Sequence, residues 1–213
     1  MADLNKLKDC LVNLEEDAVY EILKDLVSKS PDQAAKALEV CQDALTEVGD
    51  RFEKGVYFIG DLLFSSEIMK EVLNILKPAL GTKSLNQLGK MIICTVKGDI
   101  HDIGKNIVKG VLDTAGFEVI DLGIDVPAAA IIDAVKANNI KIVALSGVLT
   151  LALKSMQEVV EAFAAAGIRK DVKIIIGGNP VTADACAVIG ADDWTSSPQK
   201  GLDICRAWAA AYA

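Results

Sequence analysis

Residues 91–104 read MIICTVKGDIHDIG, and this stretch decides the fold. Met91–Val96 is a short apolar run of the length expected for a buried strand. A polar loop follows, and Gly104 opens a segment in which apolar residues recur at helical spacing. An apolar strand that passes through a short loop into a helix is typical of a parallel sheet covered by helices on both faces.

The same alternation continues to the end of the chain. It predicts an α/β domain over residues 89–213, a flavodoxin-like doubly wound sheet of five parallel strands. The other expected strands are Phe117–Leu122, Ile142–Leu145, Val172–Ile176 and a weak one near Asp193–Trp194, and the expected helices lie near 104–115, 128–138, 153–166, 181–189 and 198–211. Ligands of such sheets bind beyond the carboxyl ends of the strands, so the loops after these strands are the expected site.

Residues 1–88 follow a helical period instead, with apolar residues three and four apart, and they predict a four-helix bundle that forms a separate cap domain. Ser30 and Pro31 are expected to open the third helix, with Ser30 as its N-cap. The other signals are helix breaks at Gly55 and Gly60, an end of the fourth helix at Pro78 and Gly81, and a polar linker over 81–89.

Composition narrows the partners and the compartment. The chain has 213 residues, 52% of them hydrophobic, and a formal net charge of −8, which disfavours binding to nucleic acid. No apolar run reaches the roughly 20 residues of a membrane span, and the polar start, Met1–Lys8, is unlike a signal peptide. The five cysteines are widely spaced and form no C-x-x-C pair, so we expect reduced core thiols in a cytoplasmic protein.

The only histidine, His101, lies in the first of the strand-end loops, next to Asp102 and two residues after Asp99. A metal-bound imidazole usually donates its other N–H to a carboxylate, and Asp99 is placed to accept it. From spacing alone, His101 is also explained as a solvated loop residue or as a helix cap. Two further strand-end loops, Ser146–Thr150 and Ile176–Pro180, hold glycines that allow a ligand close to the backbone, although Gly177-Gly178 is also compatible with a simple tight turn.

Asp99-Ile100-His101-Asp102-Ile103-Gly104 matches the D-x-H-x-x-G motif of cobalamin-binding domains, and the Ser146 loop and Gly177-Gly178 match its second and third elements in order. The chain therefore resembles the cobalamin-binding region of methionine synthase, and still more the free-standing corrinoid proteins of anaerobic methyltransferase systems. The resemblance covers essentially the full chain, including the helical cap.

The resemblance implies roles for individual residues. His101 replaces the nucleotide base of the cofactor as the axial cobalt ligand, the base-off/His-on state of cobalamin or a related corrinoid, and Asp99 holds His101. The implied cofactor contacts are Asp102, Ile103 and Gly104 under the corrin ring, Ser146, Val148, Thr150, Gly177 and Gly178 along the nucleotide tail, and Trp194 and Thr195 at the last strand's end. Trp194 is equally well explained as a core residue.

Three further positions complete the match or depart from it. Phe52 and Ile59 fall where the methionine synthase cap carries apolar residues above the cobalt, although both are also explained as filling of the bundle core. Ala152 stands where methionine synthase has a serine that extends the His–Asp pair into a proton relay. We therefore expect a pair of His101 and Asp99 without a third member.

By resemblance, the chain is a methyl carrier that is not catalytic alone. The expected partners are a donor methyltransferase, an acceptor methyltransferase that uses tetrahydrofolate or a thiol coenzyme, and a reductive activator. The alternatives are a cobalamin-dependent sensor, the small subunit of a cobalamin-dependent mutase, and a flavodoxin-like protein that binds flavin or another nucleotide. Both tryptophans, Trp194 and Trp208, lie in the sheet half and none in the cap, which disfavours a light sensor.

Overall fold

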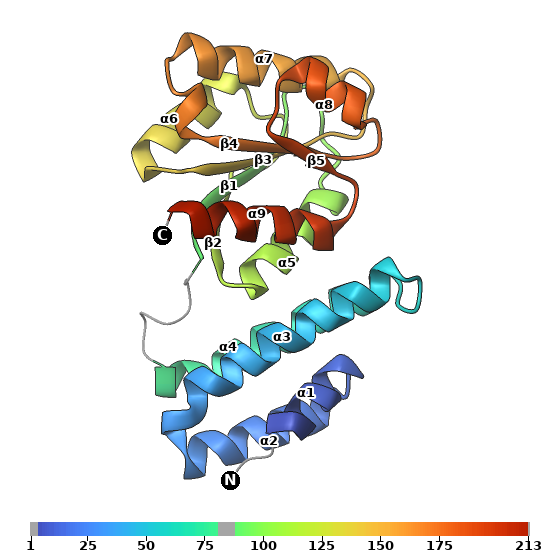
Figure 1. Cartoon of the computed structure of the whole chain (residues 1–213), viewed down its shortest axis with the longest axis vertical. Helices are drawn as coiled ribbons and strands as arrows, with labels where there is room; N and C mark the ends of the chain where they lie inside the picture. Colours follow the sequence, from blue (N-terminus) through green and yellow to red (C-terminus); the bar gives the residue numbers. More distant parts are fainter. Residues whose placement is uncertain (1–3, 81–87, 213) are drawn as a thin grey trace. The chain divides into compact units, whose positions relative to one another are not determined.

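The structure is a computed structural model that describes residues 4–80 and 88–212. The chain forms two compact units: Met1–Gln87 with Thr114–Gly116, and Leu88–Asp113 with Phe117–Ala213. We call them the helical unit and the sheet unit and describe each by itself. Figure 1 colours the elements of both along the sequence.

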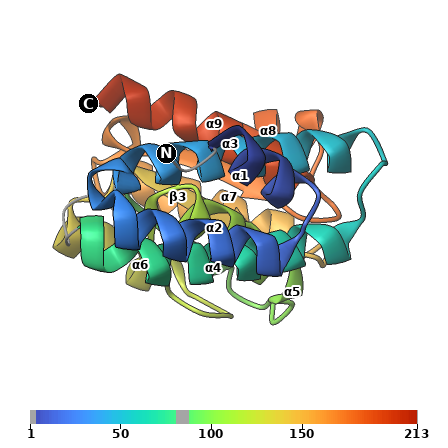
Figure 2. The same cartoon turned by 90° about the horizontal axis from the view of Figure 1, so that it is seen from below.

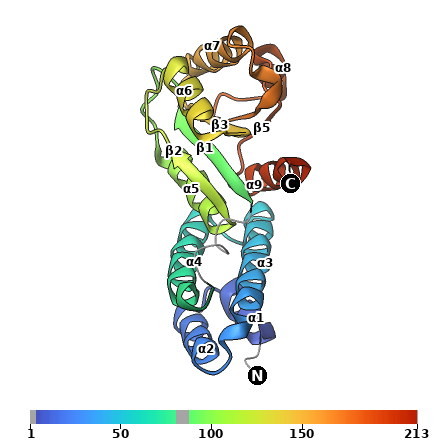
Figure 3. The same ribbon diagram turned by 90° about the vertical axis from the view of Figure 1, so that its left-hand side faces the viewer.

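The described part of the helical unit contains the four expected α-helices. α3 packs against α1 and α4, and α2 runs alongside α4, as Figures 2 and 3 show. Its core consists of leucine, valine, isoleucine, methionine, alanine and cysteine side chains that recur every three or four residues. The helices are α1 (Leu4–Val12), α2 (Glu16–Lys29), α3 (Ala34–Glu53) and α4 (Ile59–Leu80), with a 3-10 turn, η1 (Pro31–Gln33), before α3.

Three of the expected helix signals are wrong in detail. Ser30 makes no side-chain cap bond; its N–H donates to the Leu26 carbonyl and closes α2. Gly60 lies in the first turn of α4, where Asp61 accepts a hydrogen bond from the N–H of Phe58. Pro78 lies inside α4, which continues to Leu80, so this proline does not end the helix.

The remaining signals of this region have mixed outcomes. Gly55 follows α3 with a φ of +71°, a conformation that glycine adopts at little cost, so the break expected there is real. Gly81 and residues 81–87 of the expected linker lie outside the described residues. Gly89, the last residue of that linker, is the first residue of a strand.

The sheet unit has the predicted doubly wound architecture. Its five strands are all parallel, in the order β2-β1-β3-β4-β5. Buried branched residues fill the middle strands, as expected for a sheet that is covered on both faces. The strands are β1 (Gly89–Thr95), β2 (Phe117–Asp121), β3 (Ile142–Ser146), β4 (Lys173–Gly177) and β5 (Asp193–Thr195).

Helices cover both faces of this sheet. α6, α7 and α8 lie on one face, and α5 and α9 lie on the other (Figure 1). Met156 and Phe163 of α7 are fully buried and belong to the core cluster formed with the strands. The helices are α5 (Ile103–Thr114), α6 (Ala128–Asn138), α7 (Ala152–Ala165), α8 (Ala183–Ile189) and α9 (Pro198–Tyr212), with a 3-10 turn, η2 (Arg169–Asp171), before β4.

The strand register aligns the carboxyl ends at one edge. Thr95 of β1 pairs with Ser146 of β3, Ser146 pairs with Gly177 of β4, and Gly177 pairs with Thr195 of β5. The loops that follow these residues therefore begin side by side. Among the described residues, no helix has the length and apolar character needed to cross a membrane.

Candidate functional site

The loop between β1 and α5 carries the histidine and brings it to Asp99. The Asp99 Oδ1 atom lies 3.0 Å from the His101 Nδ1 atom and also accepts a hydrogen bond of 3.0 Å from the His101 main-chain N–H. The His101 side chain is 48% exposed, whereas Asp99 is fully buried. Because Nδ1 is engaged with Asp99, Nε2 is the nitrogen that the ring offers to a metal.

The other oxygen of Asp99 is bound by a different loop. Its Oδ2 atom accepts hydrogen bonds from the N–H groups of Val148 at 2.7 Å and Leu149 at 3.1 Å. Burial acts to raise the pKa of Asp99, but the hydrogen bonds from His101, Leu149 and Val148 favour the anion and hold that pKa below its ordinary value. Asp99 is therefore a fixed carboxylate anion with both oxygens occupied.

Ala152, at the start of α7, and the Asp99 carboxylate both lie beside Gly147. A Cβ atom built on Gly147 would come within 2.4 Å of the Ala152 Cβ and 3.6 Å of the Asp99 Oδ2. Ala152 is 2% exposed and carries no hydroxyl group. In this chain, main-chain N–H groups from the β3–α7 loop are the donors on the side of Asp99 that faces away from His101.

Exposed apolar side chains follow β1, β2 and β3 at the carboxyl edge of the sheet. Single exposed apolar residues are ordinary, but several on one edge are typical of a binding surface. We call them the apolar collar: Ile100 (65% exposed), Ile103 (78%), Ile124 (46%), Leu149 (41%) and Leu151 (77%). This arrangement fits a flat macrocycle that already holds a metal within its ring. The protein then supplies only one imidazole and an apolar surface.

The loops after β3 and β4 touch through their glycines. The Gly147 N–H donates to the Gly177 carbonyl at 3.1 Å. Gly178 has a φ of +122°, and a Cβ atom there would lie 1.9 Å from the Gly147 carbonyl oxygen. A Cβ atom on Gly177 would lie 2.9 Å from the Thr195 carbonyl oxygen. These glycines allow three strand-end loops to approach one another more closely than side chains would permit.

The other residues expected along the tail lie on the same edge. Ser146 is the last residue of β3, Val148 and Thr150 lie in the loop that follows it, and Val148 is 39% exposed. Thr195 is half-buried and its Oγ1 accepts a hydrogen bond from the Ser197 N–H at 2.9 Å. Trp194 is half-buried and packs against the core of the sheet unit, so the simpler interpretation of this side chain has structural support.

Side-chain interactions hold the start of α5 in place. Asp102 accepts a hydrogen bond of 3.0 Å from the Asn106 side chain, and nothing lies within 4 Å of a Cβ atom built on Gly104, so Gly104 faces open space. Lys105 is 2% exposed, and its ammonium group bonds to Asp121 at 2.5 Å and to Asn106 at 2.9 Å. This ion pair, in which only the lysine is buried, ties α5 to the end of β2.

Phe52 and Ile59 belong to the helical unit, where they flank the turn between α3 and α4. Ile59 is 44% exposed and Phe52 is half-buried, and neither is part of the core cluster of that unit. The interpretation that both fill the bundle core therefore lacks support. Val56 and Phe58 of the same turn are also exposed, at 61% and 72%.

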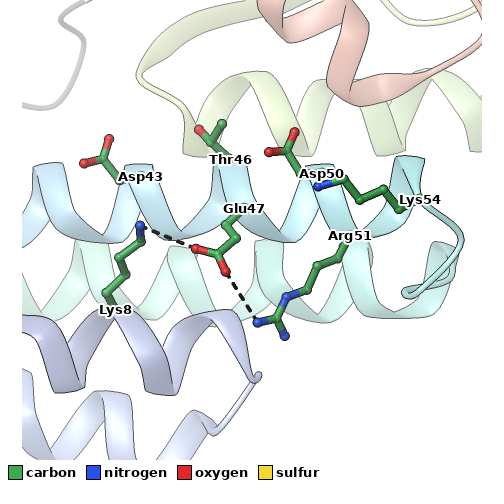
Figure 4. A pocket seen from close by; sticks show the side chains of 7 residues that line it. All are labelled: Lys8, Asp43, Thr46, Glu47, Asp50, Arg51 and Lys54. Carbon is green, nitrogen blue, oxygen red and sulfur yellow. Dashed lines mark hydrogen bonds and ion pairs between the residues drawn. The ribbon is translucent and has the colours of Figure 1, made fainter.

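The helical unit also carries a surface pocket of about 570 Å³ (Figure 4). Charged side chains line it, and several pair with one another: Lys8 lies 3.4 Å from Glu47, and Arg51 lies 3.4 Å from the same carboxylate. Arg51 further donates to the Tyr57 hydroxyl and the Asn13 side chain. Its polar, charged lining does not suit a corrin.

Three participants in the His101 site were not identified from the sequence: the Leu149 amide, Thr95 and Asp125. Leu149 donates to Asp99, the Thr95 hydroxyl donates to the Asp99 carbonyl, and Asp125 donates its N–H to that same carbonyl. A signal existed for Thr95, because it is a hydroxyl residue inside an otherwise apolar run. The main-chain donors have no residue type to mark them.

Comparison with known proteins agrees with this geometry. Two family models described as B12 binding domains match residues 89–198 and 3–77. Trimethylamine corrinoid protein 1 of Methanosarcina acetivorans is 34% identical over 204 residues, which cover 95% of this chain and 94% of that protein.

Two solved structures share the fold. A cobalamin-binding protein from Desulfitobacterium hafniense is 45% identical with a TM-score of 0.87, and the match covers 98% of this chain and 99% of that chain. The methanol:cobalamin methyltransferase complex of Methanosarcina barkeri contains a chain that is 27% identical with a TM-score of 0.80, covering 97% of this chain and 79% of that one. The chain belongs to the family of B12-binding domain proteins, and its cofactor is a corrinoid.

Proposed function

We propose that this protein is a methyl carrier, which holds a corrinoid with His101 as the axial cobalt ligand and presents it in turn to a donor and an acceptor methyltransferase. The observation that carries the proposal is the pair of His101 and Asp99 at the carboxyl edge of the sheet, with Nε2 left free for a metal. Relatives named as trimethylamine corrinoid proteins support the same assignment.

Each residue of the pair has its own task. Asp99 keeps the Nδ1 proton in place and so presents the lone pair of Nε2 to the cobalt. Because Asp99 is anionic and fully hydrogen-bonded, it also makes the imidazole a more basic ligand. When bound, the corrinoid supplies the cobalt that accepts and gives up the methyl group, while the chain supplies orientation and shielding.

The apolar collar would form the bed of the corrin ring, with Ile103 and Gly104 beneath it and Asp102 at its border. Ser146, Val148, Thr150, Gly177 and Gly178 would line the path of the nucleotide tail, and Trp194 and Thr195 would close its end. The exclusion of water by apolar side chains protects a reactive metal centre from side reactions. Phe52 and Ile59 would provide this protection on the reacting face.

The partners follow from the chemistry that the names of the relatives suggest. The donor methyltransferase would bind the methylated substrate, and methylamines are the class that the names of the relatives suggest. The acceptor methyltransferase would pass the methyl group to tetrahydrofolate or a thiol coenzyme, and a reductive activator would restore cobalt that has been oxidised. We place the protein in the cytoplasm.

A labelling experiment tests the ligand directly. Because His101 is the only histidine of the chain, ¹⁵N-histidine introduces the label at a single ring. After reconstitution with hydroxocobalamin and one-electron reduction, the axial nitrogen hyperfine pattern of the paramagnetic cobalt should change with the label. An unchanged pattern would show that another nitrogen binds the metal.

The variant His101→Ala should still bind cobalamin through the tail but should give a spectrum without the histidine ligand. Gln157→Ala on α7 is the control, since Gln157 is bonded only to Glu161 on the same helix face. Failure of the unmodified protein to bind hydroxocobalamin would rule out the proposed function as a whole.

A further inference from the structure

The end of β1 carries a buried hydroxyl group at the centre of the His101 loop. Thr95 is fully buried, and its Oγ1 donates a hydrogen bond of 2.5 Å to the Asp99 carbonyl. The same oxygen accepts a hydrogen bond of 2.9 Å from the Asp125 N–H. One hydroxyl group thus joins the loop after β1 to the segment after β2.

These bonds complete the immobilisation of Asp99. Its N–H donates to the Val96 carbonyl at 3.0 Å, and its carbonyl accepts from Thr95 and from the Asp125 N–H, the latter at 3.0 Å. Its carboxylate accepts four hydrogen bonds from His101, Val148 and Leu149. The direction in which Asp99 holds the imidazole therefore depends on how its main chain is fixed.

Asp125 holds the same loop from outside. Its Oδ1 atom accepts a hydrogen bond of 2.6 Å from the Gly98 N–H, and both residues have positive φ angles, +54° for Asp125 and +84° for Gly98. A non-glycine residue in the left-handed region persists only where its surroundings hold it there. The Val126 N–H donates to the Thr95 carbonyl at 3.1 Å, which fastens this segment to β1.

We propose that Thr95 is a positioning residue for the axial ligand: its hydroxyl group, together with Asp125, fixes the Asp99 main chain so that His101 Nε2 faces the cobalt. The inference rests on the proposed function. It differs from the His–Asp pairing itself, because Thr95 touches neither the ring nor the carboxylate and acts only through the main chain of Asp99.

The test compares Thr95→Val with Thr95→Ser. Valine keeps the shape of the side chain but leaves the Asp99 carbonyl and the Asp125 N–H without their hydroxyl partner, whereas serine restores it. In full-length protein loaded with hydroxocobalamin, Thr95→Val should lower the ratio of histidine-bound to histidine-free cobalt at least about tenfold. Thr95→Ser should return this ratio to that of the unmodified protein, read from the visible spectrum and the ¹⁵N-histidine hyperfine pattern.

A control separates positioning from lost stability. Thr182 caps α8 of the same unit, where its Oγ1 accepts a hydrogen bond of 3.1 Å from the Ala185 N–H. Thr182→Val also removes a hydroxyl group that stabilises the sheet unit, but it should leave the cobalt spectrum unchanged. A full histidine-bound spectrum in Thr95→Val would overturn the proposal, and so would equal loss in both variants.

Two further outcomes are distinguishable. If Thr95→Val does not fold, Thr95→Ala decides, because alanine also removes the hydroxyl group but leaves the main-chain hydrogen bond from Asp125 to Asp99 in place. A ratio in Thr95→Ala equal to that of the unmodified protein would then contradict the proposal. A lack of ¹⁵N hyperfine coupling in the unmodified protein would instead contradict the assignment of His101 as ligand, and with it the proposed function.

Discussion

Replacement of Asp99 by asparagine removes charge and half of the acceptor capacity without changing the size of the side chain. Asp99 accepts two hydrogen bonds at each carboxylate oxygen. An amide has one oxygen, so its NH2 group must face one of the two pairs of donors. If the NH2 group faces His101, it donates a hydrogen bond to Nδ1. The ring proton must then move to Nε2, the nitrogen that would bind the metal. If it faces the other way, the amides of Val148 and Leu149 lose their acceptor.

The magnitude follows from the bonds lost: one, that of the His101 main-chain N–H, when the NH2 group faces His101, and two when it faces Val148 and Leu149. Hydrogen bonds to a charged group contribute about 1.5–3 kcal/mol each, so the sheet unit should lose at least about 1.5 kcal/mol of its free energy of unfolding. For a chain of this length, this corresponds to a fall of at least roughly 3 °C in the unfolding midpoint.

Tryptophan fluorescence is the suitable assay, because Trp194 and Trp208 both lie in the sheet unit and report on it separately from the helical unit. Asp133→Asn, the same change at an exposed position on α6, is the control and should have almost no effect. A midpoint for Asp99→Asn within about 1 °C of the control would refute the reasoning, because it would mean that the four bonds contribute no net stability.

Gly178→Ala should destabilise the sheet unit more than Gly167→Ala, measured by urea unfolding. Both glycines have positive φ, so each substitution costs about 1–2 kcal/mol of backbone strain. Only at Gly178 would the new Cβ atom strike the Gly147 carbonyl, at 1.9 Å, while Gly167 faces open space. Equal stability of the two variants would contradict the close approach of these loops. Iodoacetamide at about pH 8 should label no thiol in the folded protein and all of them in urea, since an ordinary thiol has a pKa of about 8.5. All five thiols are buried, and burial raises the pKa to about 12 for Cys41, Cys94 and Cys205. Rapid labelling of any one thiol in the folded protein would contradict its burial.

The sequence was most informative where burial dictates residue type. The runs Met91–Val96 and Ile142–Leu145 coincide with β1 and β3 to within a residue or two, because strands buried on both faces need continuous apolar side chains. β5 gave a weak signal, since its three residues, Asp193–Thr195, are all half-buried and two of them are polar. Pro78 misled because proline disfavours a helix without excluding it, and α4 continues two residues past it, to Leu80.

The sequence predicted the side chains of the site but not its main-chain hydrogen bonds. The spacing of Asp99 and His101 indicated their contact, and the 3.0 Å distance between Oδ1 and Nδ1 agrees with it. The amides of Val148 and Leu149 come from 49 and 50 residues further along the chain. Every residue except proline has such a donor, so only the paired register of β1 and β3 reveals which ones reach Asp99.

The carboxylate of Asp99 serves two loops at once, one oxygen for His101 and one for the start of the 148–151 loop. In thermodynamic terms, if the arrangement of that loop changes the free energy of ligation by the imidazole, then ligation changes the free energy of that loop arrangement by the same amount. Nucleotide tail affinity and axial ligation would then be linked functions that report on each other. Mutations that change the specificity of the tail loop would therefore also shift the reduction potential of a metal they never touch.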